Sequence, residues 1–126
     1  MEWTFRNDLP IYAQLVEKIK RGIVSGEMPP GARLAPVREL AMEAGVNPNT
    51  MQRALQELER EGLVFPQRTA GRYVTEDTKV IEKVKRTMAE SQLEGFLAAM
   101  KELGYDRDGI IALLREEKEE SQNADS

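Results

Sequence analysis

Hydrophobic residues recur at three- and four-residue steps through most of this chain, a spacing that predicts amphipathic helices. The clearest case is residues 46–64. Four apolar side chains share one face of this stretch: Met51, Ala54, Leu55 and Leu58. Asn47 is a strong N-cap residue, and Pro48 suits the first helical position. Gly62 favours the left-handed conformation that ends a helix, so the stretch is predicted to be one capped helix.

The opposite face of this helix is polar in an unusual way. Near the helix start it carries amides and an arginine: Asn49, Gln52, Arg53 and Gln56. These side chains can form paired hydrogen bonds with base edges in a DNA major groove. The pattern therefore predicts a DNA-reading face, with an ordinary solvated helix face as the alternative.

Two more helices precede this one. The first opens at Pro10 and is predicted to end near residue 25, and its cations Lys18, Lys20 and Arg21 either contact phosphate or face solvent. The second opens at Pro36 and ends at Gly45. Its link to the 46–64 helix is so short that the pair is predicted to form a helix-turn-helix. Arg38 lies on the outer face of the second helix, where such motifs contact phosphate or a groove edge.

Alternating strand signals follow the helix-turn-helix. Residues 63–65 and 72–75 are predicted to be strands joined by a turn over 66–71, and residues 32–34 a further short strand. A helix-turn-helix with such a hairpin is a winged helix. Arg68 and Arg72 would lie on the wing, near phosphates or a minor groove. The alternative is a hairpin that only covers the core.

Residues 76–104 form a long helical pattern, and Asp106 can cap a last helix before a polar end expected to be frayed. Two helices cannot bury so many large side chains against each other alone, so the excess apolar surface is expected to meet a second copy of the chain or the first domain. The expected dimer contacts are Val84, Met88, Phe96, Leu97, Met100, Ile110 and Leu114. The predicted fold is mainly α with a small β-hairpin: a winged helix-turn-helix over 1–75 and a two-helix dimerisation domain over 76–126.

Charge is distributed unevenly along the chain. The net charge is −4; residues 1–75 carry ten basic and nine acidic side chains, and residues 76–126 carry eight and thirteen. The N-terminal part is thus nearly neutral, so DNA binding must depend on individually placed charges and not on an attractive overall field.

Absent residue types narrow the function. The chain has no cysteine and no histidine, which excludes thiolate zinc sites and Cys- or His-based catalysis. No cofactor, metal or enzymatic activity is expected. No apolar run approaches the roughly 20 residues needed to span a bilayer, and a cytoplasmic location is expected.

Residues 10–74 resemble the winged-helix domain of the GntR family of bacterial transcription regulators. The resemblance rests on several segments in register: Pro10-Ile11-Tyr12, Gln14-Leu15, Ile23, Gly26, Pro30-Gly31, Arg33-Leu34, Arg38-Glu39-Leu40-Ala41, Val46-Asn47, Asn49-Thr50, Ala54-Leu55, Leu58, Gly62-Leu63 and Gly71-Arg72-Tyr73-Val74. The short remainder, about 50 residues, looks like the YtrA subfamily, whose members have a small two-helix dimerisation domain. The resemblance implies a homodimeric, sequence-specific DNA-binding regulator, a repressor of a palindromic operator in an operon that includes its own gene, often with transporter genes.

The resemblance also assigns roles residue by residue. Arg38 stands at the family's backbone-contacting arginine. The start of the recognition helix and its next outward positions are Asn47, Asn49, Thr50, Gln52 and Arg53. Two positions depart from the family pattern. Thr69 replaces the usual wing-tip glycine, and Ala35-Pro36 replaces a Pro-Ser pair whose serine would cap the second helix.

The sequence leaves two other kinds of binding partner possible. The winged helix could dock another protein, with the acidic C-terminal domain as the contact surface. A small-molecule effector could occupy a pocket at the dimer interface, lined by Phe96, Met100 and Tyr105, although a plain dimer core is the simpler interpretation.

Overall fold

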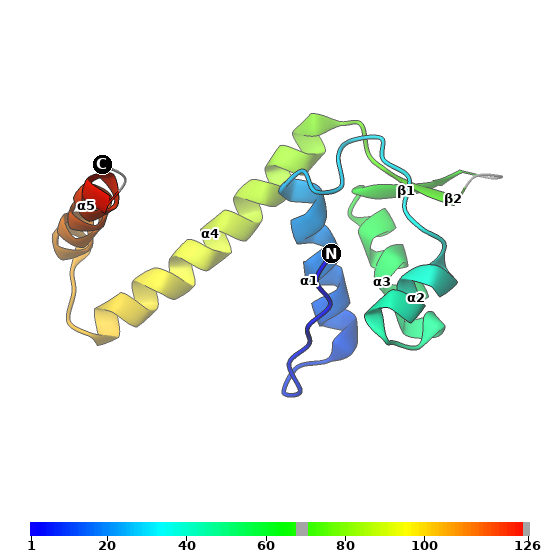
Figure 1. Ribbon diagram of the computed structural model, residues 1–126, viewed down its shortest axis with the longest axis horizontal. Coiled ribbons are helices and arrows are strands. Elements are labelled where there is room, and N and C mark those ends of the chain that lie inside the picture. Colours follow the sequence, from blue (N-terminus) through cyan, green and yellow to red (C-terminus); the bar gives the residue numbers. More distant parts are fainter. Residues whose placement is uncertain (68–70, 125–126) are drawn as a thin grey trace. The chain divides into compact units, whose positions relative to one another are not determined.

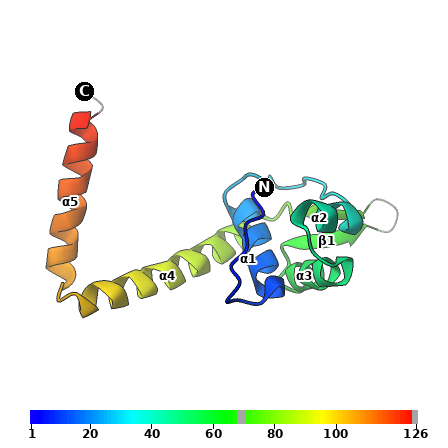
Figure 2. The same cartoon turned by 60° about the horizontal axis from the view of Figure 1, so that its bottom comes forward.

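The computed structural model describes residues 1–67 and 71–124, which form two compact units, Met1–Lys85 and Arg86–Ser126. The first unit contains helices α1 (Ile11–Val24), α2 (Val37–Ala44) and α3 (Pro48–Arg60), followed by strands β1 (Val64–Gln67) and β2 (Gly71–Val74). Helix α3 contacts α1, α2 and β1, so the other elements of this unit are arranged around it (Figures 1 and 2). The helix-turn-helix and its hairpin form the predicted winged helix.

One continuous apolar core holds the first unit together. Its largest fully buried side chains are Leu15, Ile19, Ile23, Met51, Leu55, Leu58, Leu63, Val64 and Val74. They come from α1, α3 and the hairpin, and the α3 members are the apolar stripe that the helical spacing predicted. Because these side chains leave water together, α3 is fixed by burial along its whole length.

The hairpin is antiparallel and pairs Val64 with Val74 and Gln67 with Gly71. Strand β1 extends through Pro66, where the sequence predicted a turn. Proline is tolerated there because β1 is an outer strand: within the described residues it pairs with β2 alone. Arg68 and Thr69 lie outside the described residues.

The short strand predicted over residues 32–34 is reduced to a single bridge between Arg33 and Tyr73. Backbone N–H groups of Leu34 and Val74 donate to the carbonyls of Arg72 and Ala32, at 2.9 and 2.8 Å. Prolines at positions 30 and 36 flank this segment and prevent a longer ladder.

Helix α4 (Thr78–Glu102) begins in the first compact unit, which ends at Lys85. The reason is packing. Ile81 is buried in the first core, and Val80 and Val84 pack against it. Val84, one of the expected dimer contacts, is half-buried and packs against the core of the winged helix, and a contact with a second copy stays a prediction.

The second unit contains the rest of α4 and helix α5 (Arg107–Ala124). Asp106 caps α5 as predicted, since its carboxylate accepts a hydrogen bond from the N–H of Gly109 at 2.8 Å. The helix continues to Ala124, further than the polarity of this end suggested, because Glu, Lys, Gln and Ala have high helix propensity. No helix within 1–67 or 71–124 is long and apolar enough to cross a membrane.

Candidate nucleic-acid interface

The start of α3 is built as the sequence predicted. The side-chain oxygen of Asn47 accepts a hydrogen bond from the N–H of Asn49 at 2.8 Å, and Pro48 occupies the first helical position. Asn49 and Arg53 are exposed on the face away from the core. Thr50 and Gln52 are half-buried, so fewer of their atoms are available to a partner.

Arg53 has an aromatic neighbour that the sequence analysis did not identify. Its guanidinium carbon lies 4.2 Å from the ring centroid of Tyr12, in the first turn of α1. This is cation–π distance. The contact was missed because the two residues are far apart in sequence and only the packing of α1 on α3 brings them together.

The acidic end of α3 is neutralised by cations from three different places. Glu57 pairs with Arg60 of the same helix. Lys20 of α1 lies 2.8 Å from Glu61, and Arg72 of β2 lies 2.6 Å from Glu59. Negative charge at this end of the helix would repel DNA phosphates, and each ion pair reduces that repulsion.

These ion pairs also change the interpretation of two predicted contacts. Arg72 was predicted to lie on the wing facing DNA, but its side chain is 18% exposed and its Nε donates to Glu59. It joins the wing to α3. Lys20 likewise pairs with Glu61. The sequence alone suggested that both cations face DNA or solvent, but each is held in an ion pair.

Arg38 is exposed at the second position of α2, on the outer face of the helix-turn-helix. Helix α2 begins after Pro36 and has no side-chain hydrogen bond at its N-cap. This agrees with the missing serine noted in the sequence. Gly45 ends the helix in the left-handed conformation, with φ +70°. It produces the tight turn that delivers the chain to Asn47.

Arg33 is a second cation at the base of the wing that the sequence analysis did not select. Its side chain is exposed, and a Cβ placed on Gly71 would lie 3.8 Å from its Nε. Among the residues that the structure describes, Arg33, Arg38 and Arg53 have no carboxylate within ion-pairing distance. Arg33 belongs to the segments that carry the family resemblance, but the sequence assigned it no role, because only the bridge to Tyr73 places it beside the hairpin.

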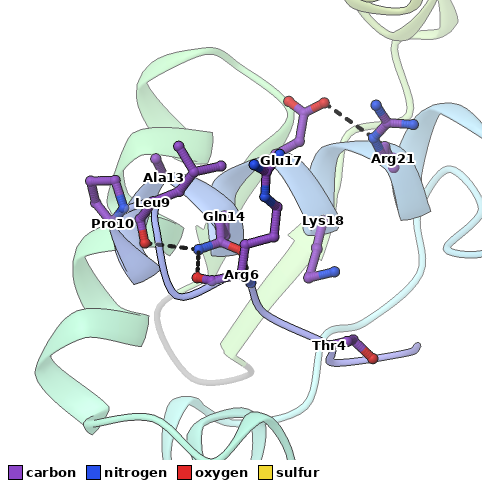
Figure 3. Close-up of a pocket in the computed structure, with 9 residues that line it drawn as sticks. All are labelled: Thr4, Arg6, Leu9, Pro10, Ala13, Gln14, Glu17, Lys18 and Arg21. Atoms are coloured by element: carbon purple, nitrogen blue, oxygen red, sulfur yellow. Dashed lines mark hydrogen bonds and ion pairs between the residues drawn. The ribbon is translucent and has the colours of Figure 1, made fainter.

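The other side of α1 is covered by the N-terminal arm, with a groove of about 450 Å³ between them (Figure 3). Gln14 fastens the arm: its side chain accepts from the N–H of Arg6 at 2.7 Å and donates to the carbonyls of Arg6 and Leu9, both at 2.9 Å. The guanidinium groups at this groove have carboxylate partners, Asp8 for Arg6 and Glu17 for Arg21. Lys18 also lines the groove, and its ammonium nitrogen lies 5.5 Å from the ring centroid of Phe5 in the arm.

The second unit leaves many large apolar side chains exposed. These are Leu93, Phe96, Leu97, Leu103, Tyr105, Leu113 and Leu114. Ile110 is buried within the unit, whereas Met88 and Met100 are half-buried. A groove of about 540 Å³ runs between α4 and α5, lined by Leu93, Leu97, Lys101, Tyr105, Asp106, Arg107, Ile110 and Ile111. Of the three residues predicted to line an effector pocket, it contains Tyr105 but neither Phe96 nor Met100.

Comparison with known proteins agrees with this geometry. Residues 11–74 match the model of the "Bacterial regulatory proteins, gntR family", which is more than half of the chain. The chain belongs to the GntR family. It is therefore a DNA-binding transcriptional regulator and not an enzyme, as the sequence predicted. Membership of this family also favours DNA, and not another protein, as the binding partner of the winged helix.

Two curated relatives and a solved structure match this GntR regulator over most of its length. It is 37% identical to the uncharacterised HTH-type transcriptional regulator YhcF of Bacillus subtilis (strain 168), over 88% of this chain and 92% of that protein. It is 35% identical to the HTH-type transcriptional repressor YtrA of the same strain, over 88% and 86%. A GntR family transcriptional regulator from Listeria monocytogenes matches the fold with a TM-score of 0.83 at 39% identity, over 89% and 98%. The likeness thus includes the C-terminal helices, as expected for a YtrA-like member.

Proposed function

We propose that this GntR regulator is a homodimeric repressor that reads a palindromic operator with the first turns of α3. The observation that carries the proposal is the charge arrangement along that helix. Its start exposes Asn49 and Arg53, while the glutamates at its end are each paired with a cation. Amide and guanidinium groups are the side chains that recognise base edges in the major groove. Arg38 would contact the phosphate backbone beside them.

The uncovered apolar surface of α4 and α5 supports the dimer. Large exposed apolar patches are unusual on a monomer, and a second copy would cover Phe96, Leu97 and Leu114. Two recognition helices would then enter successive major grooves about 34 Å apart. The groove between α4 and α5 would become part of the dimer core, so no separate effector is needed to explain it. Repression is proposed from the likeness to YtrA, and an operon that includes the protein's own gene is proposed as the target.

The first test is binding to the DNA upstream of its own gene, measured by fluorescence anisotropy with a scrambled duplex as control. We expect tight binding of two chains per site and a steep loss of affinity with salt, because each neutralised phosphate releases counterions. Equal, weak binding to both duplexes would contradict the proposal for this site.

Arg53→Ala tests base reading. We expect it to weaken binding to the operator duplex by about tenfold or more while leaving the scrambled duplex nearly unaffected, since a lost base contact removes discrimination. Arg115→Ala, at an exposed position of α5, is the matched control and should change neither affinity. Equal losses on both duplexes would contradict a base-reading role for Arg53.

Arg38→Ala tests the phosphate contact. We expect weaker binding to both duplexes and a salt slope, log Kd against log salt, that is shallower by about one. The same two duplexes and the Arg115→Ala control apply. An unchanged slope would rule out a phosphate contact at this position.

A further inference from the structure

The contact between Tyr12 and Arg53 is the most informative feature outside the polar face of α3. The Tyr12 ring is half-buried between α1 and α3, and the guanidinium carbon of Arg53 lies 4.2 Å from its centroid. Arg53 itself is exposed, so the ring covers one side of the cation and leaves the rest open. The ring is thus a contact surface for a side chain that has no carboxylate partner among the described residues.

The chemistry of this contact suits a residue that must bind something else. A guanidinium stacked on an aromatic ring uses its flat face, while its five N–H donors point outward in the plane. A carboxylate partner would instead occupy those donors, as Glu59 does with the Nε of Arg72. Tyr12 therefore orders Arg53 and leaves its donors available for a base edge.

Helix α1, which carries Tyr12, has contacts on two sides. On one side α1 packs on α3, and the neighbouring Leu15 and Val16 are buried in the core. On the other side Gln14 holds the N-terminal arm through three hydrogen bonds (Figure 3). The ring is consequently placed before any DNA arrives, and ordering a side chain in advance reduces the cost of binding.

We propose that Tyr12 is a positioning residue for DNA recognition, which stacks beneath Arg53 and holds its guanidinium ready for the operator. The inference rests on the proposed role of Arg53 in base reading. It adds that α1, which the helix-turn-helix geometry does not place in the groove, contributes to operator selectivity through one aromatic side chain.

The test is a double-mutant cycle on an operator duplex that the wild-type protein has selected from random DNA. Tyr12→Leu removes the aromatic face, and Tyr12→Phe keeps the ring and removes only the hydroxyl. We expect Tyr12→Leu to weaken operator binding by about three- to fivefold, the size of an exposed cation–π contact. Tyr12→Phe should bind as the wild type does. In an Arg53→Ala background, Tyr12→Leu should cause no further loss.

Melting temperatures separate positioning from folding. If Tyr12→Leu lowers the melting temperature markedly, Tyr12→Met supplies an apolar replacement that adapts its shape to the site. Two results would overturn the inference. One is that Tyr12→Leu weakens operator binding as much in the Arg53→Ala background as in the wild type. The other is wild-type operator affinity for both Tyr12→Leu and Tyr12→Met. The role of Arg53 is judged separately, from the single variant: if Arg53→Ala keeps full selectivity, base reading by Arg53 fails and the inference fails with it.

Discussion

Asn47 combines two tasks at the start of α3 that can be separated by substitution. Its side-chain oxygen caps the helix through the N–H of Asn49. A DNA contact at the same residue is proposed from the family resemblance. Capping needs only an acceptor oxygen, whereas proximity to phosphate disfavours negative charge. An aspartate at this position would satisfy the first requirement and violate the second.

Replacement of Asn47 should therefore affect stability and DNA binding differently. Asn47→Ala removes the cap and should lower the free energy of unfolding by about 1 kcal/mol, measured by urea denaturation. Asn47→Asp should keep the stability of the wild type, because a carboxylate also caps and suits the helix N-terminus. It should nevertheless bind operator DNA more weakly. Equal stability of the alanine variant and the wild type would show that the cap contributes little.

The turn between α2 and α3 determines where the recognition helix begins. Gly45 has φ +70° and ψ +35°, and the N–H of the following Val46 donates to the carbonyl of Ala41 at 3.0 Å. Nothing lies within 4 Å of a Cβ added at Gly45. Space is thus available for a side chain, and the backbone conformation is the only obstacle to a larger residue.

Gly45→Ala should lower the free energy of unfolding by about 1 kcal/mol, because the left-handed conformation is unfavourable for a residue with a Cβ. Gly45→Asn is the matched control. Asparagine enters this region more readily, so it should recover much of the loss. Urea denaturation of both variants measures the difference. Equal stability of the two would mean that φ is not the cause.

The two units of the chain differ in how completely they bury their apolar side chains. The first unit has a continuous core, whereas the second leaves Phe96, Leu97 and Leu114 exposed. Helical spacing places Leu97 on the apolar face of α4 and Ser91 on the opposite, polar face. The proposed dimer would cover the apolar side chains that the second unit leaves exposed.

Leu97→Glu should convert the proposed dimer into a monomer, because a carboxylate buried in an apolar interface without a partner is strongly unfavourable. Sedimentation analysis of the full chain measures this. Operator affinity should fall by about tenfold or more as one half-site contact is lost. Ser91→Glu introduces the same charge on the polar face and should remain dimeric. A dimeric Leu97→Glu variant would place the interface elsewhere.

Local sequence patterns were sufficient to predict the helices and part of the candidate DNA-binding site. The Asn47 cap, the apolar stripe of α3 and the Asp106 cap were all predicted, since each depends on neighbours within about four residues. The hairpin was predicted too, but its limits were shifted, because Pro66 is accepted only on an outer strand. Nothing local shows that Val84 packs on the winged helix, because that contact joins elements far apart in the sequence.

The sequence by itself determined the order of the elements, the polar face of α3 and the family, because helical periodicity and end signals act between near neighbours. Only the tertiary structure decided what each cation does. Arg72 and Lys20 were interpreted from sequence as facing DNA or solvent, yet they neutralise Glu59 and Glu61. Arg53 instead rests on a ring from α1. A long side chain can reach partners on other packed elements. Which partners lie within reach depends on distances in the folded structure, and sequence spacing does not give those distances.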